Sequence, residues 1–162
     1  MIAAACGGGE PANTAATATA ATVARVVDGD TIVLADDRRV RLVQIDSPEQ
    51  GDECYAAQAT AELRSLLPPG TRVRLEGDPA LDGVDRYHRL LRYVLRDGEN
   101  LNLELVRRGA AAPYFYRGVR GRHADRLLDA AEAARSAPRG LWAACLGTPL
   151  EPDRQVDTGP AG

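Results

Sequence analysis

The stretch from Val26 to Glu49, reading VVDGDTIVLADDRRVRLVQIDSPE, constrains the fold more than any other part of the chain. It overlaps three short β-rich runs, at 23–27, 31–34 and 39–45, which are separated by turn residues. Asp28-Gly29 between two apolar runs is a strong hairpin signal. The third run ends before Pro48, because proline cannot continue a central strand. The stretch therefore predicts a three-stranded antiparallel meander.

Two further strands and three helices are predicted after the meander from the spacing of apolar residues. The strands are expected over residues 71–76 and 90–96, and the helices over residues 55–67, 102–109 and 122–137. Asn102 is expected to cap the second helix and Gly109 to end it. Five short strands with a helix inserted after the third predict an α+β fold, a five-stranded OB-type β-barrel with three helices.

A single domain with flexible ends is expected. A length of 162 residues allows one hydrophobic core and hardly two. Residues 1–22 contain few large apolar side chains and are predicted to form a flexible N-terminal segment. Residues 147–162 contain prolines and acids with little to pack, which predicts a disordered C-terminal tail. The domain is therefore expected over residues 23–146, and no apolar run in the chain is long enough to span a membrane.

Charge is segregated along the domain. Residues 27–85 hold 13 acidic residues and 6 arginines, whereas residues 86–126 hold 10 arginines and 4 acidic residues. Such asymmetry is typical of a protein that binds a cation with one half and an anionic partner with the other. A solvated surface on which the charges interleave would have the same composition, so charge alone leaves both interpretations open.

The three cysteines suggest two different roles. Cys54 and Cys145 bracket the domain, and a disulfide between them is a hypothesis that fits an exported protein. Cys6 follows Ile2 and three alanines and resembles the lipid-modified cysteine at the end of a bacterial lipoprotein signal peptide, although the basic and long apolar regions are missing. Lipidation of Cys6 and an accidental cysteine in an alanine run both remain open.

Two aspartates of the meander are candidate metal ligands. Asp30 follows the hairpin turn and Asp46 ends the third strand, so both are expected at the same edge of the sheet. Two carboxylates with a backbone carbonyl and waters suit Ca²⁺, which prefers oxygen ligands. Taken alone, Asp28-Gly29-Asp30 can also be just a hairpin turn. Likewise, the segment after Asp46 can be just a helix-entry turn with a capping hydroxyl from Ser47.

Arginines and one further acid complete a candidate site for phosphodiester hydrolysis. Arg41 lies in the third strand and Arg89 begins the fifth. A metal ion and two bidentate arginines would supply the positive field that the phosphoryl group needs as negative charge develops on it. Glu49 would act as the base that orients or activates water. Lone arginines are usually solvated, so they gain weight only as part of this set.

An aromatic segment suggests where a nucleic acid would bind. Tyr114-Phe115-Tyr116 is followed by Arg117 and Arg120. Aromatic rings beside arginines form a surface for stacking bases and holding phosphates of a single strand. Core packing is the alternative, and Phe115 is expected in the core, whereas alternation would place both tyrosines on the opposite face.

Four blocks of this chain resemble, in order and spacing, the signature blocks of the staphylococcal nuclease (thermonuclease) family: VVDGDT, RLVQIDSPE, DRYHR and GAAAPYFY. The resemblance implies the OB barrel and Ca²⁺-dependent endonucleolytic cleavage of DNA and RNA that leaves 3′-phosphate ends. By position it implies metal ligation by Asp30, Asp46 and the carbonyl of Ser47, and catalysis by Arg41, Glu49 and Arg89. It further implies substrate binding by four residues, Arg86, Tyr87, Tyr114 and Tyr116.

The chain departs from the family pattern in three places. Ser47 stands where threonine is common, His88 replaces a usual glycine, and residues 50–53 form a shorter stretch. If that glycine is needed for a positive φ, the loop must differ around Arg89. His88 and His123 are expected to be surface residues without a catalytic part.

The sequence therefore predicts a monomeric nuclease with little sequence preference, because arginine contacts to phosphate do not read bases. It is expected to act on nucleic acid, with single strands preferred, and to need no obligate protein partner. A secreted or envelope-anchored bacterial protein is expected, with a possible lipid anchor through Cys6. The alternative is a non-catalytic OB module that binds nucleic acid or protein. An oligosaccharide-binding OB domain would not need the acidic cluster.

Overall fold

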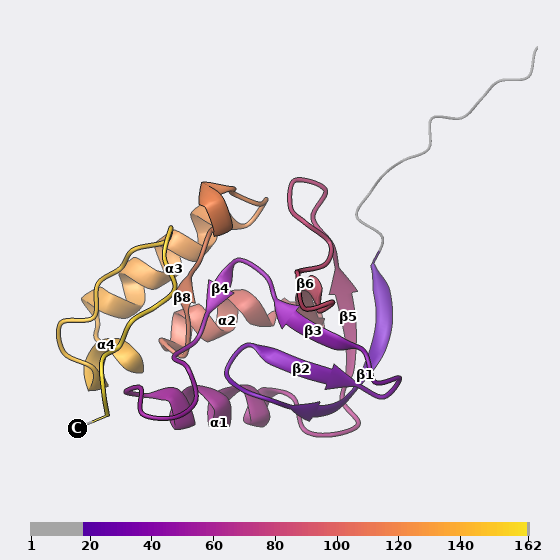
Figure 1. The fold of residues 1–162 in the computed structure, drawn as a ribbon, viewed down its shortest axis with the longest axis horizontal. Coiled ribbons are helices and arrows are strands. Elements are labelled where there is room, and N and C mark those ends of the chain that lie inside the picture. Colours follow the sequence, from indigo (N-terminus) through magenta and orange to yellow (C-terminus); the bar gives the residue numbers. More distant parts are fainter. Residues whose placement is uncertain (1–17, 162) are drawn as a thin grey trace, which may run out of the picture.

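A computed structural model describes residues 18–161, and its strands close into a barrel (Figure 1). The main sheet has the order β3-β2-β1-β5-β6-β7, and the parallel pairing of β3 with β6 closes five of these strands into the barrel. The bounds of the strands are β1 Thr19–Val26, β2 Thr31–Leu34, β3 Arg39–Leu42, β4 Ile45–Asp46, β5 Arg72–Glu76, β6 Leu90–Arg96, β7 Glu99–Asn100 and β8 Ala112–Pro113. The predicted five-stranded OB-type barrel is confirmed.

The first strand starts earlier than the sequence indicates. Residues 19–22 pair with β5, with Thr19 opposite Leu75. These four residues were expected in the flexible N-terminal segment, and that boundary is wrong because small side chains at a barrel edge still pair through their backbone. The rest of that segment, residues 1–17 with Cys6, lies outside the described residues.

The third strand is broken, which the alternating sequence did not indicate. Residues 39–45 were expected to be continuous, but β3 ends at Leu42 and the chain turns at Val43 and Gln44, whose φ is 64°. The next two residues form β4, which pairs antiparallel with β8. This break takes Asp46 out of the barrel wall and places it beside Ala112.

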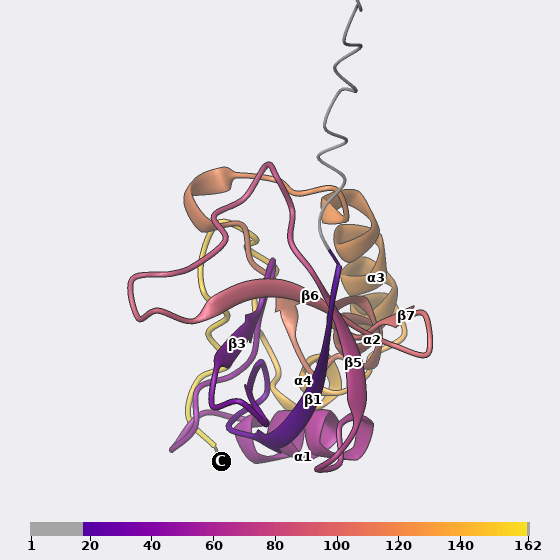
Figure 2. The same ribbon diagram turned by 90° about the vertical axis from the view of Figure 1, so that its right-hand side faces the viewer.

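Three helices cover the barrel, as predicted. They are α1 Ala56–Leu66, α2 Leu101–Arg108 and α3 Ala124–Ser136, and a one-turn helix, α4 Leu141–Ala144, follows them. In Figure 2, α1 lies across one end of the barrel and α3 beside it. No helix in residues 18–161 is long and apolar enough to cross a membrane.

The cap of α2 differs from the prediction. Asn100, not Asn102, accepts a hydrogen bond from the backbone N–H of Leu103. Asn102 is buried inside the first turn, where its amide accepts from the N–H of Val94 and donates to the carbonyl of Val43. The helix ends at Gly109 as expected, with φ 69°.

The chain after α4 is packed, so the predicted disorder of residues 147–162 is wrong for all but the last of them, which is not described. We refer to residues 147–161 as the C-terminal strap. Val156 is only 9% exposed and joins a small apolar cluster that also contains Trp142 and Cys145. Backbone hydrogen bonds hold the rest of the strap against residues 52–54 and Phe115. Such bonds carry no signature in side-chain composition, which explains the error.

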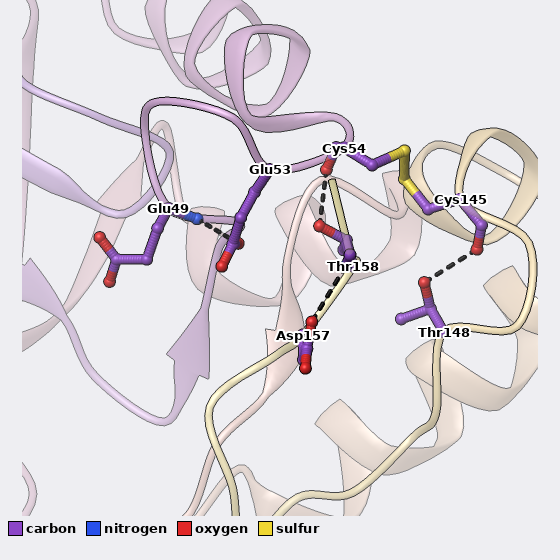
Figure 3. Close-up of a disulfide and its surroundings, with 8 residues drawn as sticks. Glu49, Glu53, Cys54, Cys145, Thr148, Asp157 and Thr158 are labelled. Atoms are coloured by element: carbon purple, nitrogen blue, oxygen red, sulfur yellow. Dashed lines mark hydrogen bonds between the residues drawn. A yellow bond between two sulfur atoms is a disulfide. The ribbon is translucent and has the colours of Figure 1, made fainter. Parts of the chain in front are cut away.

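The predicted disulfide is present. Cys54, just before α1, is bonded to Cys145 at the end of α4, with an S–S distance of 2.07 Å. The strap leaves this bridge and returns past Cys54, so both ends of the strap lie beside the disulfide (Figure 3).

Candidate functional site

Arg41 lies between two buried carboxylates. Its Nε is 3.1 Å from Asp30 Oδ1 and its Nη2 is 2.6 Å from Asp46 Oδ1. Nη1 donates to the carbonyls of Leu42 and Ile45 at 2.8 and 2.7 Å. The Arg41 guanidinium therefore bridges the carboxylates of both aspartates.

Local turns explain why these side chains meet. The N–H of Asp30 donates to Asp28 Oδ1 in the hairpin turn, and Asp30 Oδ2 accepts from both the N–H and the hydroxyl of Ser47 at 2.9 and 3.0 Å. Gly29 permits this approach, because a Cβ on it would lie 2.6 Å from the Cβ of Ser47.

Asp46 is held from two sides. Arg41 contacts one carboxylate oxygen, and the other accepts a hydrogen bond of 2.9 Å from the backbone N–H of Val156. Burial raises the pKa of Asp46 to about 6; Arg41 and the N–H of Val156 oppose the shift, whereas the charges of Asp30 and Glu49 add to it. The carboxyl therefore needs a cation nearby to stay ionised at neutral pH.

The charge of Arg41 is maintained by its acidic neighbours. Burial disfavours the guanidinium, but the attraction of Asp30 and Asp46, with smaller effects of Asp28 and Glu49, outweighs burial and raises the pKa of Arg41. Glu49 is exposed at the rim of this cluster. Its backbone N–H donates to Glu53 at 2.7 Å (Figure 3). Its carboxylate makes no hydrogen bond with the described residues.

Both tyrosines of the aromatic segment face away from the core, as expected. Phe115 is buried, whereas Tyr116 is exposed and Tyr114 is half-buried. Burial raises the pKa of Tyr114, and the negative charge of Asp46 adds to the rise. The cation of Arg117 lies 5.1 Å from the ring of Tyr116.

Arg86, Tyr87 and Arg89 form a second cluster, in the loop before β6. The guanidinium carbons of Arg86 and Arg89 lie 4.7 and 5.3 Å from the ring centre of Tyr87. Asp85 organises this loop: its carboxylate accepts from the backbone N–H groups of Tyr87 and Arg89 and from Arg89 Nε at 2.7 Å. Burial by itself would raise the pKa of Asp85, but these hydrogen bonds outweigh burial and lower it.

His88 adopts the conformation for which a glycine would be favoured. Its φ is 62°, in the left-handed region, so the loop keeps its course without a glycine at a modest cost in backbone energy. His123 contacts the ring of Tyr93 edge-on and also lies outside the carboxylate cluster.

Strand pairing brings the two clusters to the same side of the barrel. Arg41 in β3 is opposite Leu91 in β6, and Arg89 stands two residues before Leu91. Two residues along a strand and one strand spacing correspond to a Cα separation of about 8 Å. Arg89 uses only Nε towards Asp85, so its Nη groups have no hydrogen-bond partner in residues 18–161. Arg41 keeps one N–H, on Nη2, without a partner in the same residues, so each guanidinium retains a donor.

The donor set suits a hard cation, although residues 18–161 contain no cluster of three acidic, His or Cys side chains with metal-binding geometry. Within residues 18–161, each oxygen of Asp46 has a single partner, so each retains a lone pair. The carbonyl of Ser47, next in sequence, accepts no hydrogen bond from the described chain. Asp46 and this carbonyl can contribute oxygen ligands, with water in the shell. Each oxygen of Asp30 already contacts two donors, from Arg41 and Thr31 on one side and Ser47 on the other, so one of these contacts must be released for Asp30 to bind a metal.

Three residues that the sequence did not single out support the site. Val156 contributes its backbone N–H to Asp46, and an apolar side chain gives no sign of such a contact. Gln44 holds the segment after the tyrosines, since its amide donates to Val119 and accepts from Gly121. Asp85 could have been found from its position one residue before Arg86-Tyr87, because aspartate often bonds the backbone two residues ahead.

Comparison with known proteins agrees with this geometry. Residues 39–144 match the family model described as "Staphylococcal nuclease homologue". An "Uncharacterized endonuclease" of Escherichia coli O157:H7 is 38% identical over 125 residues, which cover 74% of each chain. A "Thermonuclease" of Staphylococcus intermedius is 37% identical over 101 residues, covering 58% of this chain and 59% of that protein.

"Endonuclease YhcR" of Bacillus subtilis is 34% identical over 136 residues; the match covers 74% of this chain but only 11% of that longer protein. The family match extends over more than half of the chain, and the barrel supports it. The chain is therefore a member of the staphylococcal nuclease family and a nuclease that hydrolyses nucleic acid.

Proposed function

We propose that this protein is a Ca²⁺-dependent endonuclease that cleaves DNA and RNA with little sequence preference and leaves 3′-phosphate ends. The observation that supports the proposal most is the bridging of Asp30 and Asp46 by Arg41, with 2.6 Å to Asp46 and 3.1 Å to Asp30. A module that only binds nucleic acid has no need to bury two carboxylates at such a point, since they repel its ligand.

Asp30, Asp46 and the carbonyl of Ser47 would hold the metal. Ca²⁺ bound there would draw electron density from a phosphoryl oxygen and so favour attack at phosphorus. The hydrogen bonds that Ser47 makes to Asp30 fix the distance between two of these ligands before the metal binds. Ca²⁺ fits because the set consists of oxygens alone.

Arg41 and Arg89 would hold the scissile phosphate. Arg41 retains an N–H on Nη2 beyond its contact with Asp46, and Arg89 retains both Nη groups. Arg89 can therefore donate two hydrogen bonds to a phosphate and Arg41 one, and these bonds strengthen as the charge of the phosphate grows. Arg86 and Tyr87 would contact a terminal phosphate, whereas Tyr114 and Tyr116 would stack on a base of an unpaired strand.

Glu49 would activate the attacking water. Its carboxylate takes a proton from water while the water oxygen bonds to phosphorus, and the bond from phosphorus to the 5′ oxygen breaks. The 5′ oxygen takes up a proton from solvent water and leaves as a hydroxyl, and the phosphate stays on the 3′ oxygen. The exposure of Glu49 at the rim of the cluster fits a group that must meet both solvent and substrate.

We also propose that the protein works outside the cytoplasm as a monomer, either secreted or held at the bacterial envelope through Cys6. The Cys54–Cys145 disulfide supports export, because such bonds persist in oxidising compartments.

Cleavage of a fluorescent single-stranded DNA oligonucleotide, with Ca²⁺ or with excess chelator, tests the proposal. Chelation should abolish cleavage, and Glu49→Gln should slow it at least about a hundredfold while DNA binding is retained. Asp52→Asn is the matched control, because Asp52 is an exposed acid of the same loop whose carboxylate has no hydrogen-bond partner within residues 18–161. It should cleave at the parent rate.

Two results would refute the proposed chemistry. Full activity in excess chelator would exclude the metal site, and equal rates for Glu49→Gln and Asp52→Asn would exclude the role of Glu49. Product ends are checked separately: primers with 3′-phosphates are not extended by a polymerase until a phosphatase has acted. Immediate extension would contradict the direction of cleavage.

A further inference from the structure

The C-terminal strap lies outside the part of the chain that matches the family. That match ends at residue 144, and residues 147–161 then run back across the molecule beside β8 and β4 (Figure 1). The strap nevertheless makes hydrogen bonds with three separate segments, and each of these segments carries residues of the candidate site.

The first contact is with a candidate metal ligand. The backbone N–H of Val156 donates to Asp46 Oδ2 at 2.9 Å, across 110 residues of sequence. Asp46 is only 2% exposed, so water cannot readily replace this donor. With Arg41 on one oxygen and Val156 on the other, the carboxylate plane has one orientation.

The second contact is with the loop that carries Glu49. The N–H of Cys54 donates to the carbonyl of Gly159 at 2.9 Å, and the hydroxyl of Thr158 donates to the carbonyl of Cys54 at 2.8 Å. Glu53, the residue before Cys54, accepts a hydrogen bond from the N–H of Glu49. Figure 3 shows the arrangement, with Thr158 beside Cys54 and Glu53 turned towards Glu49.

The third contact is with the aromatic segment. The N–H of Phe115 donates to the carbonyl of Pro152 at 2.6 Å, between Tyr114 and Tyr116. The side chain of Val156 also anchors the strap, because it packs in a buried apolar cluster with Ala112 and Trp142. The strap is thus a single segment that contacts Asp46 directly, the loop of Glu49 through Cys54, and the aromatic segment through the backbone of Phe115.

We propose that the C-terminal strap is a positioning element of the active site, in which the backbone N–H of Val156 orients Asp46 for the metal. This inference rests on the proposed Ca²⁺ site. Loss of a hydrogen-bond donor to a metal-ligating carboxylate typically lowers metal affinity or activity about 10- to 100-fold. The strap acts through Asp46.

Replacing Val156 with proline tests this inference in the full-length chain, because proline lacks the N–H. Val156→Ala is the matched comparison: it keeps the N–H and loses only apolar packing. Ca²⁺ binding is measured by calorimetry, together with melting temperature and the separate values of kcat and KM. We expect Val156→Pro to weaken Ca²⁺ binding about 10-fold or more and to lower kcat at saturating DNA. Val156→Ala should lower the melting temperature with less than about threefold change in Ca²⁺ affinity.

The outcomes separate the inference from the proposed function. If both variants lose stability but bind Ca²⁺ like the parent, the strap is only structural and the inference is overturned, while the nuclease proposal stands. A parent that binds no Ca²⁺ overturns both. If Val156→Pro does not fold, Thr158→Val replaces it, since it removes one anchor of the strap. Faster hydrogen exchange at the Val156 amide must then accompany weaker Ca²⁺ binding, and faster exchange with unchanged affinity contradicts the inference.

Discussion

Removal of the Arg41 guanidinium offers a quantitative test of the carboxylate cluster. Arg41→Met keeps a long side chain but leaves Asp30 and Asp46 without their shared cation. The Arg41 side chain is 12% exposed, and the side chains of Asp30 and Asp46 are less exposed still. Breaking a buried ion pair by removing one partner typically costs about 3–5 kcal/mol.

Protonation of Asp46 limits this cost at low pH. Burial raises its pKa to about 6 even with Arg41 present, and the value should rise further without it. A carboxyl whose pKa is raised by folding destabilises the protein at pH values above that pKa, and the penalty is relieved as pH falls through it. At about pH 8, two units above, protonation costs about 3 kcal/mol; at about pH 5.5 it costs almost nothing.

We therefore expect Arg41→Met to lower the free energy of unfolding by about 3–5 kcal/mol near pH 8 and by about 1–2 kcal/mol near pH 5.5. Urea unfolding followed by circular dichroism in the presence of chelator measures both values. Added Ca²⁺ should recover part of the loss near pH 8, because it binds the folded state alone.

The matched control is Arg38→Met. Arg38 makes an equally short ion pair of 2.7 Å with Asp36, but both side chains are about half exposed, so its loss should leave stability close to that of the parent at either pH. Two results would contradict this reasoning. One is that Arg41→Met lowers the free energy of unfolding no more than Arg38→Met near pH 8, and the other is that it lowers it equally at both pH values. Either result would mean that Asp30 and Asp46 are not a buried pair that depends on the charge of Arg41.

Two further predictions concern the scaffold around the site. The double variant Cys54→Ser, Cys145→Ser opens a crosslink between residues separated by 91 positions and should lower the free energy of unfolding by about 4–5 kcal/mol; a loss under about 1 kcal/mol in urea unfolding would contradict it. Gly29→Ala should cost about 1–3 kcal/mol by overpacking, since its Cβ would lie 2.6 Å from that of Ser47. Gly83→Ala, where the nearest atom is 3.8 Å away, should be nearly neutral in the same assay, and equal losses would argue against a steric cause.

The barrel could be predicted because its signals are local. Asp28-Gly29 marks a hairpin, Pro48 ends a run, and the apolar stripe at Ala56, Ala59 and Leu63 is buried as its spacing indicates. The break at Gln44 could not be predicted in this way. Glutamine has no preference for a positive φ, and the bonds that hold it come from residues 119 and 121, more than 70 positions away.

Only those parts of the candidate site that are charged side chains could be predicted from the sequence. Asp30, Arg41 and Asp46 have charges that pattern and resemblance both indicate, and the structure brings them within ion-pair distance. The strap was not predictable, because its contacts to Asp46 and Cys54 involve backbone groups of Val156 and Gly159. Every residue has such groups, so composition could not distinguish a packed segment from a loose one.

The position of the disulfide determines how far this protein can be shortened. A gene trimmed to the family match at residues 39–144 would encode neither Cys145 nor Asp30, and it would lack β1 and β2, which form two of the five barrel strands. Fusion partners and purification tags are therefore best attached before Thr19 or after the last residue of the strap, where they leave both the barrel closure and the covalent link intact.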